Sequence, residues 1–175
     1  NPSICIAKLL NKAKELSINK PDSDDFLIIV PVHVTVGEKA YGISAGYGEL
    51  HLTLRSWNKE QLEKTNQEFQ EFVDEDCKEE NLRFEEEKIE AFESNLNHSE
   101  AVSIFNKALK SSQLKSEKMS KPNRWGEDFG YFTHQLKGCM FGLGSGVNSP
   151  ALHNPDYDFP DELLNYGVPL FMKNT

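Results

Sequence analysis

The sequence lacks long hydrophobic runs and is poor in basic residues. Its 175 residues hold 19 Lys and Arg against 28 Asp and Glu, a formal net charge of −9. Nucleic acids and anionic membrane surfaces attract clustered basic side chains, and a membrane-spanning helix needs roughly 20 apolar residues in succession. We therefore expect neither nucleic acid nor a membrane as a partner.

Cysteine is also scarce, with three residues at positions 5, 77 and 139 and no CxxC pair. Three thiols cannot all pair within one chain, which favours a reducing, cytoplasmic location. Cys77 and Cys139 are expected to be small core residues. Because the sequence opens on Asn1-Pro2 without an initiator methionine, we expect it to begin inside a longer polypeptide.

Fingerprints of nucleotide binding and of nucleophilic catalysis are missing too. The glycine-rich run 142–146 contains neither GxGxxG nor GxxxxGKS. Its glycines, including Gly144, are expected to let the backbone approach a ligand or a neighbouring loop closely. Ser145 lacks the strand-turn-helix setting of a nucleophile elbow, so a nucleophilic serine is not supported.

The first half of the chain alternates between helix and strand patterns. Helical spacing of apolar residues, with Asn1 as N-cap, predicts a first helix, and the pair Asn58 and Gln61 predicts the start of a second. Expected elements are helices over 2–16 and 58–78, strands over 26–36 and 47–57, an edge strand over 82–92, and a turn over 19–23. A strand before Asn1 would complete a ferredoxin-like βαββαβ order.

The character of the chain changes near residues 93–99, where we place a domain boundary. Ser99 or Asn97 is expected to cap a helix. Further along, we expect a short helix over 128–135, a buried strand over 139–143 and a closing helix that begins at Asp158 and Pro160. The fold class expected for the whole chain is α/β or α+β.

The residues that carry chemistry concentrate between 126 and 160. His153 lies near Asp156 and Asp158, so it is either a zinc ligand supported by carboxylates or a polar loop residue beside a helix-capping Asp158. Glu127 and Asp128 precede a helix, and are either an acid/base pair in a cleft or acids placed favourably against the helix dipole.

Arg55 is the candidate from the first half. The alternation of the strand over 47–57 places Arg55 and His51 on one polar face. A guanidinium there either reaches across a cleft or is an ordinary surface charge.

Several ordered motifs give the chain a resemblance to a known family. They are Gly126-Glu-Asp-Phe-Gly-Tyr-Phe, Met140-Phe-Gly-Leu-Gly, Leu152-His-Asn-Pro, Tyr157-Asp-Phe-Pro-Asp-Glu-Leu and, upstream, Val34-Thr-Val-Gly and Leu52-Thr-Leu-Arg. In this order they resemble the metal-dependent amidohydrolases and aminoacylases, a family that includes hippurate hydrolases, glutamate carboxypeptidases and related metallopeptidases.

The resemblance implies a two-domain zinc hydrolase in which a ferredoxin-like lid, also the dimerisation domain, interrupts an α/β catalytic domain. Residues 1–93 would be a partial lid, and 94–175 the carboxyl-terminal part of the catalytic domain. The implied substrate is an acyl-amino acid or small peptide, and the implied assembly is a homodimer. Most zinc ligands and the general base of the family belong to an amino-terminal half that this sequence does not include.

The resemblance also implies roles for individual residues. His153 would be a metal ligand, Arg55 would bind the free carboxylate of the substrate, and Glu127 and Asp128 would border the pocket. One departure is the segment 45–48, where Ala-Gly-Tyr-Gly replaces the usual Asn-Val-Ile-Pro and removes an asparagine that commonly helps to hold substrate. The alternative is a binding or dimerisation module without catalysis, because one histidine and scattered carboxylates do not build a hydrolytic zinc site.

Overall fold

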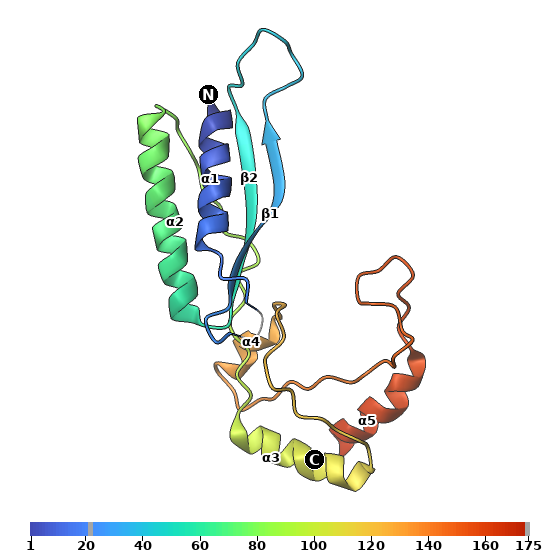
Figure 1. The fold of residues 1–175 in the computed structure, drawn as a ribbon. Coiled ribbons are helices and arrows are strands. Elements are labelled where there is room, and N and C mark those ends of the chain that lie inside the picture. The colour runs from blue at the N-terminus through green and yellow to red at the C-terminus, as the bar shows by residue number, and fades with distance from the viewer. Residues whose placement is uncertain (21–22, 174–175) are drawn as a thin grey trace. The chain divides into compact units, whose positions relative to one another are not determined.

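A computed structural model describes residues 1–20 and 23–173, so Pro21 and Asp22 of the expected turn over 19–23 lie outside the described residues. The chain divides into two compact units (Figure 1). Unit 1 comprises Asn1–Ala91 and Ser120–Trp125, and unit 2 comprises Phe92–Met119 and Gly126–Thr175. Helices and one two-stranded antiparallel sheet make the fold α+β. None of the described helices is long and apolar enough to cross a membrane.

Unit 1 begins with helix α1 (Pro2–Leu16), as the apolar spacing predicts. The Asn1 side chain accepts a hydrogen bond from the backbone N–H of Ser3 and so caps the helix, and Pro2 fits the first turn because an N–H is not needed there. The face of α1 that packs inward carries the buried residues of the helix, which are Cys5, Ile6, Leu9 and Ala13.

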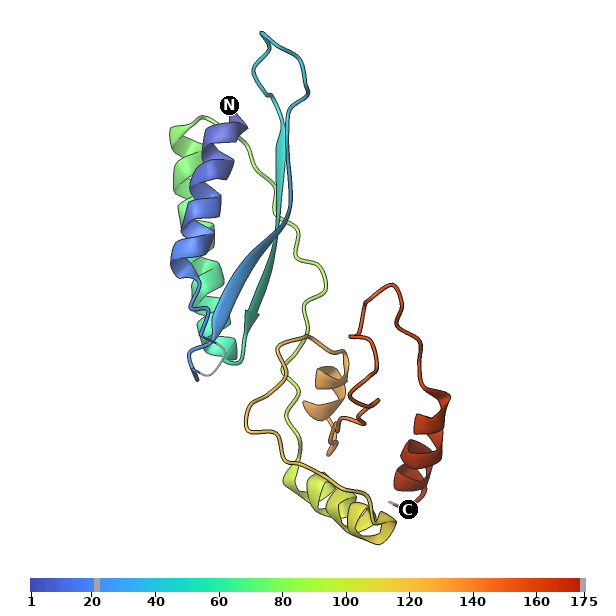
Figure 2. The same ribbon diagram turned by 45° about the vertical axis from the view of Figure 1, so that its right-hand side comes forward.

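Strands β1 (Leu27–Val36) and β2 (Gly48–Ser56) form an antiparallel hairpin that confirms both predicted strands. Leu27 and Ile29 are buried, and they pack with Ala13 of α1 in one core cluster. Helices α1 and α2 both contact the hairpin, and Figures 1 and 2 show them side by side along it. The hairpin is therefore a sheet that the two helices cover on one face.

A β-bulge interrupts the ladder between Pro31 and His33. Before it, Leu27 and Ile29 alternate onto the core face; after it, Val34 pairs with Leu50 and His33 pairs with His51. One extra residue reverses which positions of a strand face the core. The bulge therefore moves His33 to the outer face, where it meets His51.

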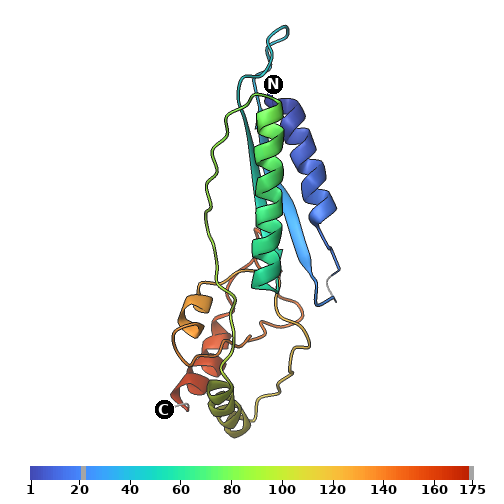
Figure 3. The same cartoon turned by 90° about the vertical axis from the view of Figure 1, so that its left-hand side faces the viewer.

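Helix α2 (Lys59–Glu79) confirms the second predicted helix and its cap, since the Asn58 side chain accepts a hydrogen bond from the Gln61 N–H at 3.0 Å. It runs antiparallel to α1: Lys8 pairs with Asp76, whereas Lys12, one turn further along α1, pairs with Glu68 at 2.9 Å. Figure 3 shows the two helices lying next to each other.

The edge strand predicted over 82–92 is wrong. This segment leaves the end of α2 as an extended chain without strand pairing, visible in Figure 3. Leu82 packs against the core cluster of Cys5, Leu9 and Cys77, but Ile89 is exposed. Among the described residues the only sheet is β1 with β2, and this segment pairs with neither strand.

The loop between the strands is closed at its base by a tight contact. Gly37 has φ +56°, its N–H donates to the carbonyl of Tyr47 at 3.0 Å, and a Cβ at this position would come within 2.8 Å of the Cβ of Ala45. Both the left-handed backbone and the close approach require glycine here. Beyond this contact, Tyr41 and Ile43 are exposed.

Unit 2 is built from short helices around a small core. Its elements are α3 (Ser99–Ser112), α4 (Phe129–Thr133), the 3-10 helix η1 (Asp161–Leu163) and α5 (Leu164–Met172). Ala108 of α3 and Leu170 of α5 are buried, and the rings of Phe105, Phe141 and Phe171 pack in series at 4.3 and 5.5 Å between centroids. Aromatic packing therefore joins α3 to α5.

Several helix boundaries differ from the prediction. The cap of α3 is His98, whose Nδ1 accepts from the Glu100 N–H, rather than Ser99 or Asn97. The closing helix begins at Asp161 after Pro160 without a side-chain cap, so the capping role expected for Asp158 is wrong. The short helix over 128–135 is confirmed as α4 with fewer residues.

The buried strand predicted over 139–143 is also wrong, and the reason lies in Asn97. The amide of Asn97 donates to the Met140 carbonyl and accepts from the Met140 N–H, both at 2.8 Å. At Met140 this side chain supplies the two backbone hydrogen bonds that a neighbouring strand would otherwise provide. Cys139 is half-buried rather than a core residue, and burial raises the pKa of its thiol.

Replacing Asn97 tests how much its two hydrogen bonds to Met140 stabilise the fold. Asn97→Asp retains an acceptor for the Met140 N–H but removes the donor to its carbonyl, while Asn97→Ala removes both. We expect losses of about 1 and about 2 kcal/mol in unfolding free energy of unit 2, measured by urea titration. Equal stability of all three proteins would contradict the assignment.

The space around Gly130 explains why the GEDFG motif ends in glycine. A Cβ at Gly130 would collide with the backbone carbonyl of Glu93, whereas a Cβ at Gly142 would meet nothing within 4 Å. We expect Gly130→Ala to lower the unfolding free energy by about 1–3 kcal/mol and Gly142→Ala, the matched control, to change it by less than about 0.5 kcal/mol. Thermal melts that reverse this order would contradict the packing described.

Candidate functional site

Arg55 lies near the end of β2 on the outer face of the hairpin, opposite Ile28 of β1. Its side chain is exposed, and Nη1 donates to the backbone carbonyl of Arg124 at 3.3 Å. No carboxylate partner of this guanidinium occurs among the described residues. The group is therefore held at one nitrogen and leaves the rest of its donor fork open to an anion.

A row of polar side chains continues along the same face of the hairpin. The imidazoles of His33 and His51 pack edge to face at 5.3 Å between centroids, and His51 Nε2 lies 3.4 Å from a carboxylate oxygen of Glu49. Glu49 also accepts from the Tyr47 hydroxyl, and this hydrogen bond, followed by that of His51, lowers the pKa of Glu49. The same contact raises the pKa of Tyr47.

His153 occupies a strained turn in unit 2. The Asn154 N–H donates to the Ala151 carbonyl at 3.0 Å, and His153, as the third residue of this turn, has φ +71°. That position of a β-turn normally takes glycine or asparagine. The imidazole is exposed and has no hydrogen-bond partner among the described residues. The turn thus presents an imidazole outward at a cost in backbone strain.

Glu127 and Asp128 lie at the entry to α4. Asp128 occupies the N-cap position but its carboxylate makes no capping hydrogen bond; instead the backbone carbonyls of Glu127 and Asp128 accept from Gly130 and Tyr131. Both residues are exposed, and neither carboxylate has a partner within the described part of the chain. Both carboxylates therefore lie at the start of α4, where a helix dipole favours acids, without a capping hydrogen bond.

Gly144 lies in open space. A Cβ at Gly142 or Gly144 would meet no atom of the described chain within 4 Å, and neither residue has a left-handed φ. Packing within this chain therefore does not require glycine at position 144. Gly146, with φ +102°, is the glycine of this run that the backbone itself requires.

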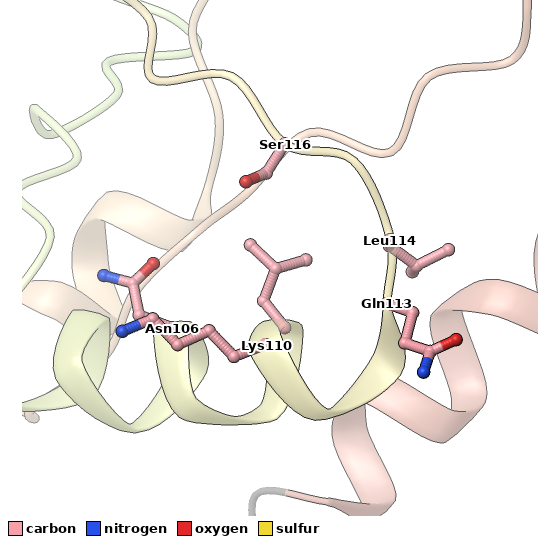
Figure 4. A pocket seen from close by; sticks show the side chains of 6 residues that line it. Asn106, Lys110, Gln113, Leu114 and Ser116 are labelled. Atoms are coloured by element: carbon pink, nitrogen blue, oxygen red, sulfur yellow. The ribbon is translucent and has the colours of Figure 1, made fainter.

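A shallow hollow of about 320 Å³ lies elsewhere in unit 2, at the end of α3 (Figure 4). Its lining residues are Asn106, Leu109, Lys110, Gln113, Leu114 and Ser116. None of the predicted site residues contributes to it. The hollow therefore gives no support for the predicted site residues.

The described residues do not make a complete metal site. A protein zinc site needs three or four ligands, and no group of three or more His, Cys, Asp or Glu within residues 1–20 and 23–173 is arranged to hold an ion. The structure therefore does not bring Glu127, Asp128 and His153 together as a ligand set. His153 is a single potential metal ligand, and it belongs to no such group among the described residues.

Sequence reasoning missed two arrangements around these residues. His134 Nε2 contacts the Ser94 carbonyl at 2.9 Å and lies 3.9 Å from the Glu93 carboxylate, which ties α4 to the segment before α3. The pairing of His33 with His51 depends on the bulge at Val32, an apolar residue that gives no sign of one. Two histidines on successive strands were the available signal.

Comparisons with known proteins give a family match. The family model described as Peptidase family M20/M25/M40 matches residues 6–173, nearly the whole chain. No curated protein matches, and no solved structure matches. The matched range includes the positions of Arg55, Glu127, Asp128, Gly144 and His153. The chain belongs to peptidase family M20/M25/M40.

Proposed function

We propose that this chain is the lid and the carboxyl-terminal catalytic segment of a zinc-dependent amidohydrolase that cleaves an amide bond of an acyl-amino acid or small peptide. The family is one of peptidases whose members are generally metal-dependent. The observation that carries the proposal is the match over 6–173, a range that contains an exposed arginine and an exposed, strained histidine.

His153 is proposed as a metal ligand. Its left-handed φ argues for this role, because the turn would form with less strain if glycine or asparagine were present. The imidazole has no other task among the described residues. The metal would supply water activation at the amide carbonyl, and the further ligands would come from outside the described residues.

Arg55 is proposed to bind the free carboxylate of the substrate. Its guanidinium makes one hydrogen bond, to the Arg124 carbonyl, and keeps donors available for a bidentate contact. Gly144 is proposed as a point of close approach by substrate, since open space surrounds it. Glu127 and Asp128, exposed and unpaired among the described residues, are proposed to border the pocket.

The proposed domains are a lid over residues 1–93 and part of the catalytic domain over 94–175. The order α1, β1, β2, α2 supports a ferredoxin-like lid, with a further strand needed at the free edge of β2. Exposed Leu136, Leu143, Val168 and Phe171 in unit 2 support a segment that packs on more protein. Exposed Val30 and Val32 on β1 support a homodimer through the lid. The cytoplasmic location stays a prediction.

A second candidate is a binding or dimerisation module without catalysis. It is favoured by the lack of a three-ligand cluster among the described residues. Calorimetric titration of the 175-residue chain with zinc tests it, because tight stoichiometric binding would contradict such a module. Amide hydrolysis by a longer form of the protein would contradict it as well.

Removing the imidazole of His153 tests the catalytic proposal in the complete protein. His153→Gly keeps a residue suited to the left-handed turn, so a loss of activity would not reflect a broken fold. We expect kcat/KM for acyl-amino acid hydrolysis to fall about 1,000-fold or more, with loss of bound zinc by elemental analysis. His153→Ala is expected to behave alike. Full activity of either variant would refute the assignment.

Substitution of Arg55 tests substrate recognition separately from metal binding. Arg55→Met is expected to raise KM for an acyl-amino acid about 10- to 100-fold while leaving metal content unchanged, because one bidentate carboxylate contact is lost. Hydrolysis of the corresponding amino-acid amide, which lacks the carboxylate, serves as the control and is expected to change little. An equal loss for both substrates would argue against carboxylate binding.

A further inference from the structure

Two of the three cysteines meet in the core of unit 1. The Sγ atoms of Cys5 and Cys77 lie 3.7 Å apart, and the two residues are 3% and 5% exposed. They are separated by 72 positions in the sequence, one in α1 and the other in α2. Neither cysteine is among the residues proposed above to bind substrate or metal.

Ion pairs hold the two helices in the register that makes this contact. Lys8, one turn after Cys5, pairs with Asp76, the neighbour of Cys77. Lys12, one turn further, contacts Glu68 at 2.9 Å and lies over the ring of Phe72. Sliding of α1 along α2 would break these contacts, so the two thiols remain neighbours while unit 1 is folded.

We propose that Cys5 and Cys77 form an oxidation site, at which a small-molecule disulfide converts the two thiols into a disulfide bond between α1 and α2. One thiolate attacks the small disulfide, whose S–S bond breaks and releases one small thiol. The second protein thiolate then attacks the protein sulfur of the mixed disulfide and releases the other. Two protein thiols lose two electrons and two protons, and the small disulfide gains both.

The structural change required is small. The sulfurs must close from 3.7 Å to about 2.05 Å, a movement that side-chain rotation and a slight approach of the helices can share. Cys5 lies in the first turn of α1 (Pro2–Leu16), and Cys77 lies in the last turn of α2 (Lys59–Glu79). Terminal turns open more readily than helix centres, which gives the oxidant access.

The surroundings make the reaction slow in the closed state. Burial, followed by the hydrogen bonds with Asp76 and Cys77, raises the pKa of Cys5 to about 12. Burial by itself would raise the pKa of Asp76, but the hydrogen bonds from Lys8 and Cys5 outweigh it and lower that pKa. The carboxylate of Asp76 beside Cys5 thus keeps the Cys5 thiol protonated. We expect the reaction to proceed when the terminal turns open, and to be faster at higher pH.

The test uses the 175-residue chain in a Cys139→Ala background, so that two thiols remain. Native protein is incubated with glutathione disulfide and analysed by intact mass and by peptide mapping without reduction. We expect a loss of about 2 Da and a linkage between the Cys5 and Cys77 peptides. The oxidised form is expected to melt about 5–15 °C higher than the reduced form, and dithiothreitol is expected to reverse the shift.

Cys5→Ala and Cys77→Ala in the same background are the matched controls, each expected to lose the bridge and the shift in melting temperature. Circular dichroism checks that every variant keeps its helices. Wild-type protein mapped in parallel is expected to give the same linkage and provides the test if Cys139→Ala does not fold. Free thiols after prolonged oxidation, a stable mixed disulfide, linkage between two chains, or a bridge that forms only in urea would each overturn the proposal.

Discussion

Unit 1 depends on a single antiparallel ladder, the pairing of β1 with β2. Two strands satisfy each other's backbone groups along one edge only, and the helices α1 and α2 cover one face. Leu27 and Ile29 supply the apolar side of this arrangement. The opposite side carries Arg55, His51 and His33 together with the apolar Ile28 and Val30. The core residues that stabilise unit 1 thus lie on one face of the sheet, and the exposed side chains, Arg55 included, lie on the other.

Local signals made the first half of the chain predictable. Helix α1 follows from Asn1 and Pro2, and α2 follows from Asn58 and Gln61, because a cap is decided by residues within one turn. The hairpin follows from alternation, which needs no knowledge of distant contacts. These elements are also the ones with the longest apolar patterns in the sequence.

The failures concern segments whose structure depends on a partner. The segments 82–92 and 139–143 have strand-like composition, but a strand exists only when another strand accepts its hydrogen bonds. Met140 is satisfied by Asn97, 43 positions away, which no periodicity could reveal. The family resemblance was confirmed by the match over 6–173, whereas the roles of Arg55 and His153 rest on motif order and on exposure.

The contact between Gly37 and Ala45 has a practical consequence for engineering. It pinches the chain at the base of the β1–β2 loop, and the Gly37 N–H completes the closure at Tyr47. The intervening tip of the loop, with exposed Tyr41 and Ile43, is thereby separated from the paired strands. Lengthening a loop whose ends are already fixed adds little entropic cost. The tip is thus a natural insertion point for a peptide tag or a fluorescent reporter that leaves the strand register unchanged.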